Sequence, residues 1–192
     1  MNDFIGLLKE NIKHIDPFKS IISQKNIGEI VIHSSCKIAE ILKEDFLNAT
    51  ALTLKETGYV EHFNNQLSGY PKVKLYDIVI SSCAIEQALQ IVKEKFKTEI
   101  DCDTAIKSII THEFIHAISV GYVSYPDMDT RNNKSKDESH TDFLANKLFT
   151  AIYPERKYFT TYDYPQTDDY EEEMSIITEE SIRQYFLGDI AL

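Results

Sequence analysis

Apolar residues recur along much of the chain at intervals of three and four positions, which is the spacing of an amphipathic helix. On this basis we predict helices over residues 4–15, 38–52, 85–96, 104–120 and 138–149. Two stretches rich in β-branched residues, 28–33 and 73–80, predict strands. The pattern therefore favours an α+β domain that is mainly helical, with a small mixed sheet.

The expected helix over 104–120 is apolar on nearly every side, which predicts a buried element. Asp103 is expected to cap its first turn, and Gly121 is expected to end it. Two histidines and a glutamate lie well inside this apolar frame. Polar side chains in a buried helix need partners, so these three residues are the first candidates for a functional site.

These three residues form an H-E-x-x-H motif, His112-Glu113-Phe114-Ile115-His116. Positions i and i+4 share one face of a helix, about 6 Å apart along its axis, so both imidazoles can reach one tetrahedral zinc ion. Glu113 lies about 100° around the helix, where its carboxylate is free to accept and donate a proton. The motif predicts a zinc-dependent hydrolase with one Zn2+ ion held by His112 and His116.

A catalytic zinc site needs a third protein ligand and an open position. The helix that follows a polar connection over 122–136 offers Glu138, His140 and Asp142. Glu138 and Asp142 share a helix face, whereas His140 points about 160° away from Glu138. We expect Glu138 on the metal and Asp142 hydrogen-bonded to a ligand histidine, with His140 as the rival third ligand. The alternative for the two acids is a solvated helix face.

The order H-E-x-x-H, a connection, and then Glu138-x-x-x-Asp142-x-x-Ala145 resembles the gluzincin branch of the zincin metallopeptidases, and the small soluble bacterial or phage type in particular. The resemblance covers roughly residues 104–154. It implies a zincin-like fold in which the active-site helix packs against a second ligand helix. It also implies that Glu138 is the third zinc ligand and that Asp142 supports a histidine.

Some features depart from neighbouring families. No third histidine follows His116 at the metzincin spacing, which argues against that branch. Thr141 occupies a place where relatives often carry Ala. The chain also has no visible membrane-spanning segments like those of the membrane proteases, and no N-terminal helix-turn-helix. Membership is therefore expected at the level of a gluzincin-like zincin.

The resulting hypothesis is a zinc metallopeptidase that hydrolyses peptide bonds in a peptide or protein substrate. Glu113 would take a proton from a zinc-activated water and pass it to the departing amine. The strand over 73–80 could offer an edge to an extended substrate. Four tyrosines are candidates for stabilising the oxyanion: Tyr153, Tyr158, Tyr162 and Tyr164. The alternative is a catalytically silent zincin-like module that binds a protein partner.

Composition narrows the classes of partner. The chain has 192 residues, of which 43% are hydrophobic, and this is enough for one domain over 1–192 with its own core. A net charge of −11 argues against nucleic-acid and membrane-surface partners. From about residue 161 onward, the sequence contains nine acidic residues and only one basic residue, Arg183. We expect this acidic C-terminal segment to be solvated surface, or else a self-inhibitory or partner-docking segment.

Cysteine usage and the N-terminal sequence bear on the compartment. The three cysteines, Cys36, Cys83 and Cys102, form neither an even set nor a C-x-x-C pair, so we expect ordinary thiols in a reducing compartment. The first residues show no basic, apolar leader of the kind that directs export. These observations predict a cytoplasmic protein.

Overall fold

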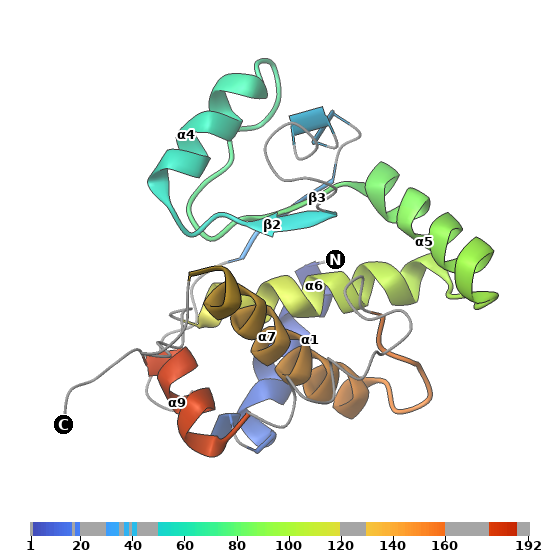
Figure 1. Ribbon diagram of the computed structural model, residues 1–192. Coiled ribbons are helices and arrows are strands. Elements are labelled where there is room, and N and C mark those ends of the chain that lie inside the picture. Colours follow the sequence, from blue (N-terminus) through green and yellow to red (C-terminus); the bar gives the residue numbers. More distant parts are fainter. Residues whose placement is uncertain are drawn as a thin grey trace.

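The computed structural model describes residues 2–16, 18–19, 30–34, 37–38, 40–41, 50–119, 130–159 and 177–187. Over these residues the chain is mainly helical and carries one small mixed sheet, which confirms the predicted α+β class (Figure 1). The helices are α1 (Asn2–Asn11), α4 (Thr57–Gln66), α5 (Ser82–Phe96), α6 (Cys102–Ile118), α7 (Thr130–Ile152) and α9 (Glu179–Leu187), with a 3-10 turn η1 (Ile12–His14) after α1. None of the described helices is long and apolar enough to cross a membrane.

The sheet has three short strands in the order β1-β3-β2. β1 (Ile32–Ser34) runs parallel to β3 (Ile78–Ile80), and β2 (Ala51–Thr53) runs antiparallel to it. The predicted strand over 73–80 is therefore real only in its last three residues. Because β3 is paired on both sides, the expectation that it offers an edge to a substrate is wrong. β1 and β2 are the outer strands over the described residues.

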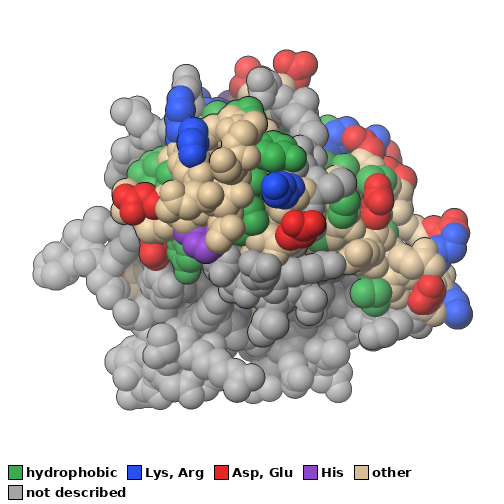
Figure 2. Space-filling model, turned by 90° about the horizontal axis from the view of Figure 1, so that it is seen from above, with side chains coloured by type: hydrophobic (Ala, Val, Ile, Leu, Met, Phe, Trp, Pro, Cys, Tyr) green, Lys and Arg blue, Asp and Glu red, His purple; other side chains and the backbone are tan. Residues whose placement is uncertain are grey.

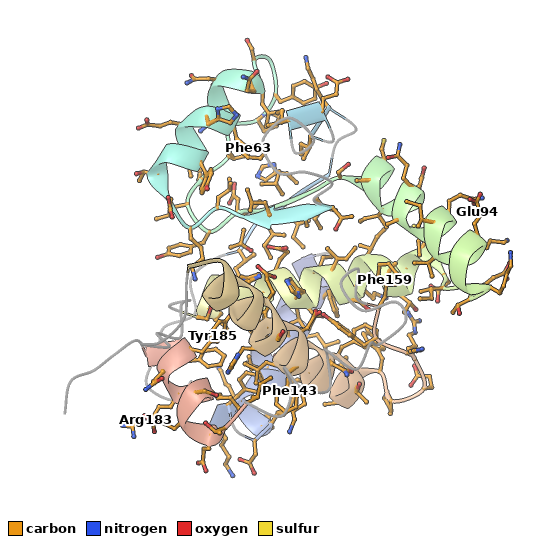
Figure 3. All side chains as sticks on the ribbon, in the orientation of Figure 1. Phe63, Glu94, Phe143, Phe159, Arg183 and Tyr185 are labelled. Atoms are coloured by element: carbon orange, nitrogen blue, oxygen red, sulfur yellow. The ribbon has the colours of Figure 1, made fainter. Side chains whose placement is uncertain are left out.

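Alternation along the strands separates two hydrophobic clusters, because successive side chains of a strand point to opposite faces. Ile78 and Ile80 belong to the large cluster that includes α6 and α7, whereas Val79 between them belongs to a smaller cluster with Phe63 of α4. Figures 1 and 3 show the same layering, with α4 on one face of the sheet and α6 on the other. The sheet is thus covered on both faces.

Helix α6 is the buried centre of the large cluster. Its residues Ile110, Phe114 and Ile115 are at most 1% exposed. Asp101 caps it by accepting a hydrogen bond from the Thr104 amide at 2.8 Å. The prediction of Asp103 as the cap was wrong, because the helix starts two residues earlier than expected and Asp103 lies inside its first turn. The helix ends at Ile118, and Gly121 lies outside the described residues.

Two other boundaries differ from the prediction. Leu52 was expected to close the helix over 38–52 but lies in β2, and the helix α4 that follows was not predicted. Only Phe63 of α4 is buried, so the sequence of α4 shows little of the repeating apolar pattern by which an amphipathic helix is predicted. Helix α7 begins at Thr130, so the polar connection over 122–136 becomes helical before its expected end.

The acidic C-terminal segment is not solvated throughout. Its described part contains α9, in which Ile182, Tyr185 and Phe186 are at most 5% exposed and belong to the large cluster. Phe186 meets Phe18 edge to face, with ring centroids 5.5 Å apart. The acids Glu179 and Glu180 are exposed at its start. The prediction of a solvated segment was therefore wrong for α9, whose apolar face joins the core.

The cysteines also depart from expectation. Cys83, in the first turn of α5, is disulfide-bonded, whereas Cys102 is a free and exposed thiol. Cys36 lies outside the described residues. The expectation of three ordinary thiols was thus wrong for Cys83.

The surface above the sheet mixes residue types. Figure 2 shows acidic, basic and hydrophobic side chains interspersed on this face. Several large apolar side chains are also exposed, including Tyr59 and Tyr70, at 38% and 44%. On the face in Figure 2 the described acidic residues do not form one continuous patch.

Candidate metal centre

The two motif helices meet along their functional faces. In Figure 1, α7 lies alongside α6 on the side away from the sheet. His112 and His116 on α6 and Glu138 on α7 bring one possible ligand atom each to within 4.8 Å of one another. Residues 22 or more positions apart in sequence are thus united by the packing of two helices.

Three atoms that face one another, His112 Nε2, His116 Nε2 and Glu138 Oε2, form a nearly equilateral triangle. His112 Nε2 lies 3.0 Å from His116 Nε2 and 3.2 Å from Glu138 Oε2, and the third side, from His116 Nε2 to Glu138 Oε2, is 3.3 Å. Ligand atoms about 2.0–2.1 Å from a tetrahedral zinc ion are separated by about 3.3 Å. The triangle therefore has the size of one face of a zinc coordination tetrahedron.

The outer nitrogen of His112 fixes its tautomer. His112 Nδ1 lies 2.8 Å from Asp142 Oδ1, and since an ionised carboxylate only accepts, Nδ1 carries the proton. In a neutral imidazole the lone pair is then on Nε2, which faces His116 and Glu138. Asp142 is 3% exposed and also accepts a hydrogen bond from Tyr158 Oη at 2.9 Å. The Nε2 lone pair of neutral His112 and the Glu138 carboxylate therefore face one another across the triangle, an arrangement that a bound cation would stabilise.

The electrostatics of the centre favour positive charge. Burial disfavours a charge on His112, but the Asp142 and Glu138 carboxylates outweigh it and raise the pKa of His112 well above its ordinary value. Burial also tends to raise the pKa of Glu138, but His116 and His112 outweigh this and lower it. Two carboxylates thus stabilise a cation among them, which is a role that a proton or a metal ion can fill.

Glu113 lies next to the triangle in sequence but faces the sheet. The Thr53 hydroxyl, on β2, donates to Glu113 Oε2 at 2.6 Å and also lies 2.9 Å from the Glu113 carbonyl oxygen. Both residues are 7% exposed. The carboxylate is therefore held between the helix that carries the two histidines and the edge strand β2. Thr53 was not predicted, because a lone threonine in a short strand gives no signal in the sequence.

His140, the rival ligand, lies elsewhere. Its side chain is fully buried, and its Nε2 lies 2.8 Å from Ser181 Oγ on α9. Its ring also stacks on Tyr185, with centroids 6.0 Å apart. Among the described residues, Glu138 joins the two histidines and His140 does not. The sequence signal that distinguishes Glu138 from His140 is helical position: Glu138 and Asp142 share one face of the helix, and His140 lies on the opposite face.

The tyrosine candidates have different surroundings. Tyr158 is buried and donates to Asp142, so its hydroxyl is engaged behind His112. Tyr153 packs against Phe4 and Phe149 at the far end of α7. Tyr162 and Tyr164 lie outside the described residues. Neither described candidate is placed as an oxyanion donor at the triangle.

A fifth tyrosine, which sequence reasoning missed, approaches the site from α9. Tyr185 projects from α9 toward α7 (Figure 3), and its hydroxyl lies 3.4 Å from His116 Nδ1. Thr141 Oγ1 lies at the same distance from that nitrogen. No spacing rule connects Tyr185 to a motif 69 positions earlier.

The chain was compared with protein-family models, with curated proteins and with solved structures. None of them matches. The case for a function therefore rests on the residues and their geometry.

The donor set fits zinc better than a harder cation. Two imidazoles and one carboxylate are a common catalytic zinc set, whereas Mg2+ and Ca2+ prefer sets made of oxygen ligands. The side chains of His116 and Glu138 remain 20% and 21% exposed, so the centre is open on one side. Three ligands with an open side leave room for a water molecule or a substrate.

Proposed function

We propose that this protein is a zinc-dependent metallopeptidase with a zincin-like fold, in which His112, His116 and Glu138 hold one zinc ion. One observation carries the proposal: His112 Nε2, His116 Nε2 and Glu138 Oε2 form a triangle with sides of 3.0, 3.2 and 3.3 Å, which is the size expected of three ligands on one zinc ion. A bound zinc ion supplies Lewis acidity, which polarises a carbonyl and lowers the pKa of a water molecule to about 7.

In this proposal, proton transfer and the orientation of the catalytic groups are carried out by side chains of the protein. Glu113 accepts a proton from the attacking water and donates it to the departing amine, because an amide nitrogen leaves poorly unless it is protonated. Thr53 orients the Glu113 carboxylate through the 2.6 Å hydrogen bond. Asp142 keeps the His112 proton on Nδ1, so that Nε2 stays available.

The substrate is proposed to be a peptide or protein segment in extended conformation. β2 contributes Thr53 beside Glu113 and is an outer strand of the sheet formed by the described residues. An extended peptide can add to such an edge through main-chain hydrogen bonds. This would place a scissile bond near both Glu113 and the open side of the triangle. The net charge of −11 still predicts no nucleic-acid partner.

A cytoplasmic location stays a proposal drawn from the sequence. The disulfide at Cys83 counts against it, because such bonds persist mainly in oxidising compartments.

The proposal is tested by cleavage of a broad peptide library with wild-type protein and with Glu113→Gln, both loaded with zinc. Glu61→Gln, an exposed change on α4, is the matched control. We expect cleavage by the wild type and by the control, a loss of at least about 100-fold in Glu113→Gln, and equal zinc content in all three. Equal cleavage by wild type and Glu113→Gln would overturn the catalytic role.

A second candidate is a zincin-like module that binds a partner without cutting it. It would use the same ligands but would have no need of a proton shuttle at Glu113. The buried hydrogen bond from Thr53 to the Glu113 carboxylate favours the enzyme, because it holds a titratable group in one orientation. A zinc-loaded wild type that cleaves no peptide in the library would favour the module.

A further inference from the structure

His116 differs from His112 in what its outer nitrogen contacts. His112 Nδ1 faces a carboxylate, whereas His116 Nδ1 lies 3.4 Å from each of two hydroxyls, Thr141 Oγ1 and Tyr185 Oη. The two hydroxyls are hydrogen-bonded to each other at 2.5 Å, and both residues are 0% exposed. The outer nitrogen of His116 thus meets a buried, neutral pair of oxygens.

We propose that Tyr185 and Thr141 are positioning residues for the metal centre. In this role the hydroxyl pair accepts a hydrogen bond from the Nδ1–H of His116, which directs Nε2 toward the metal. The inference rests on the proposed zinc site. A buried ring N–H requires an acceptor, and the outer partner of a ligand histidine sets both its tautomer and its orientation. The C-terminal helix α9 then forms part of the centre.

The charge balance explains why hydroxyls suit this position. Glu138, Asp142 and Glu113 already bring three carboxylates to the region of the centre, against the two positive charges of a zinc ion. A carboxylate on His116 as well would add an unbalanced buried charge, and such charges are costly. A neutral pair fixes the ring without that cost.

The anchoring of α9 makes the contact specific. His140 on α7 meets Ser181 on α9 at 2.8 Å and stacks on the Tyr185 ring. Ile182 and Phe186 of α9 are buried in the core and hold this helix against it. His140, the alternative candidate for the third ligand, therefore helps to fix the position of α9, the helix that carries Tyr185.

The test is a zinc titration of the full-length, metal-free protein against a competing chromophoric chelator. We compare wild type, Tyr185→Phe, Thr141→Val and the double variant. Tyr153→Phe, which removes a hydroxyl just beyond the C-terminal end of α7, is the matched control. We expect the double variant to lose zinc affinity about 10- to 100-fold, with smaller losses in each single variant and none in the control. Cobalt absorption should shift in the double variant, because the ligand ring is reoriented.

The outcomes separate two claims. A wild type that takes up neither zinc nor cobalt would overturn the proposed function itself. Equal zinc affinity in wild type and the double variant would overturn only the positioning role. Thr141→Ser, combined with Tyr185→Phe, keeps one hydroxyl and should regain affinity over the double variant. Should the double variant fail to fold by circular dichroism, Tyr185→Phe against Tyr153→Phe decides, since equal affinity there counts against the role.

Discussion

At the scale of single residues, the Thr53 hydroxyl is the contact most directly tied to the proposed chemistry. Thr53→Val keeps the side-chain shape but removes the hydrogen bond to Glu113. Hydrogen bonds to charged groups contribute about 1.5–3 kcal/mol, so we expect kcat to fall about 10- to 100-fold, with unchanged zinc content. Steady-state cleavage measures this. Thr53→Ser should keep most of the rate, and an unchanged kcat in Thr53→Val would contradict the role.

Asp142 carries a separate prediction. It is buried and accepts hydrogen bonds from His112 and Tyr158, so Asp142→Ala leaves both donors without this partner. We expect zinc affinity to fall about 10- to 100-fold, as measured by chelator competition. Asp103→Ala, an exposed acid in the first turn of α6, serves as the control. Similar losses in both variants would show a general charge effect instead of a specific one.

The sequence could indicate the site residues on the two motif helices, but not the partners that other elements contribute. His112, His116, Glu138 and Asp142 follow from helical spacing, because each pair lies within one helix and its phase is fixed by 3.6 residues per turn. Thr53 lies 60 positions before Glu113 in the sequence, and Tyr185 lies 69 positions after His116. Such contacts depend on how elements pack, and no local pattern records that.

At the scale of elements, α9 is the clearest departure from expectation and the source of a stability prediction. Phe186 is fully buried against Phe18, so Phe186→Ala should destabilise the fold by about 3–5 kcal/mol. Urea denaturation measures the free energy of unfolding. The exposed Glu180→Ala should change it by less than about 0.5 kcal/mol. Equal stability of both variants would mean that α9 does not belong to the core.

Elements were predictable where periodicity was strong. α5 and α6 were predicted nearly complete, because each has several apolar residues at helical spacing. α9 was missed because its few apolar residues sit in an acidic stretch that was interpreted as solvated. The order of the strands could not be predicted, since pairing partners lie 25 or more positions apart.

At the scale of the whole molecule, the proposed ion bridges α6 and α7 and should couple metal binding to global stability. A ligand present at 100 times its Kd stabilises a protein by about 2.7 kcal/mol. For a chain of this size that corresponds to a rise in Tm of about 5–10 °C. We expect chelation to lower Tm by this amount and added zinc to restore it, as followed by circular dichroism. His116→Ala should show no zinc-dependent shift, and an equal shift in that variant would place the metal elsewhere.

The most direct test of the central claim is the metal-to-protein ratio measured by mass spectrometry after zinc loading and desalting. The account predicts one zinc ion per chain in the wild type and in His140→Gln, and a ratio near zero in Glu138→Ala. A wild type without zinc would contradict the site. Zinc retained in Glu138→Ala but lost from His140→Gln would contradict the choice of ligands.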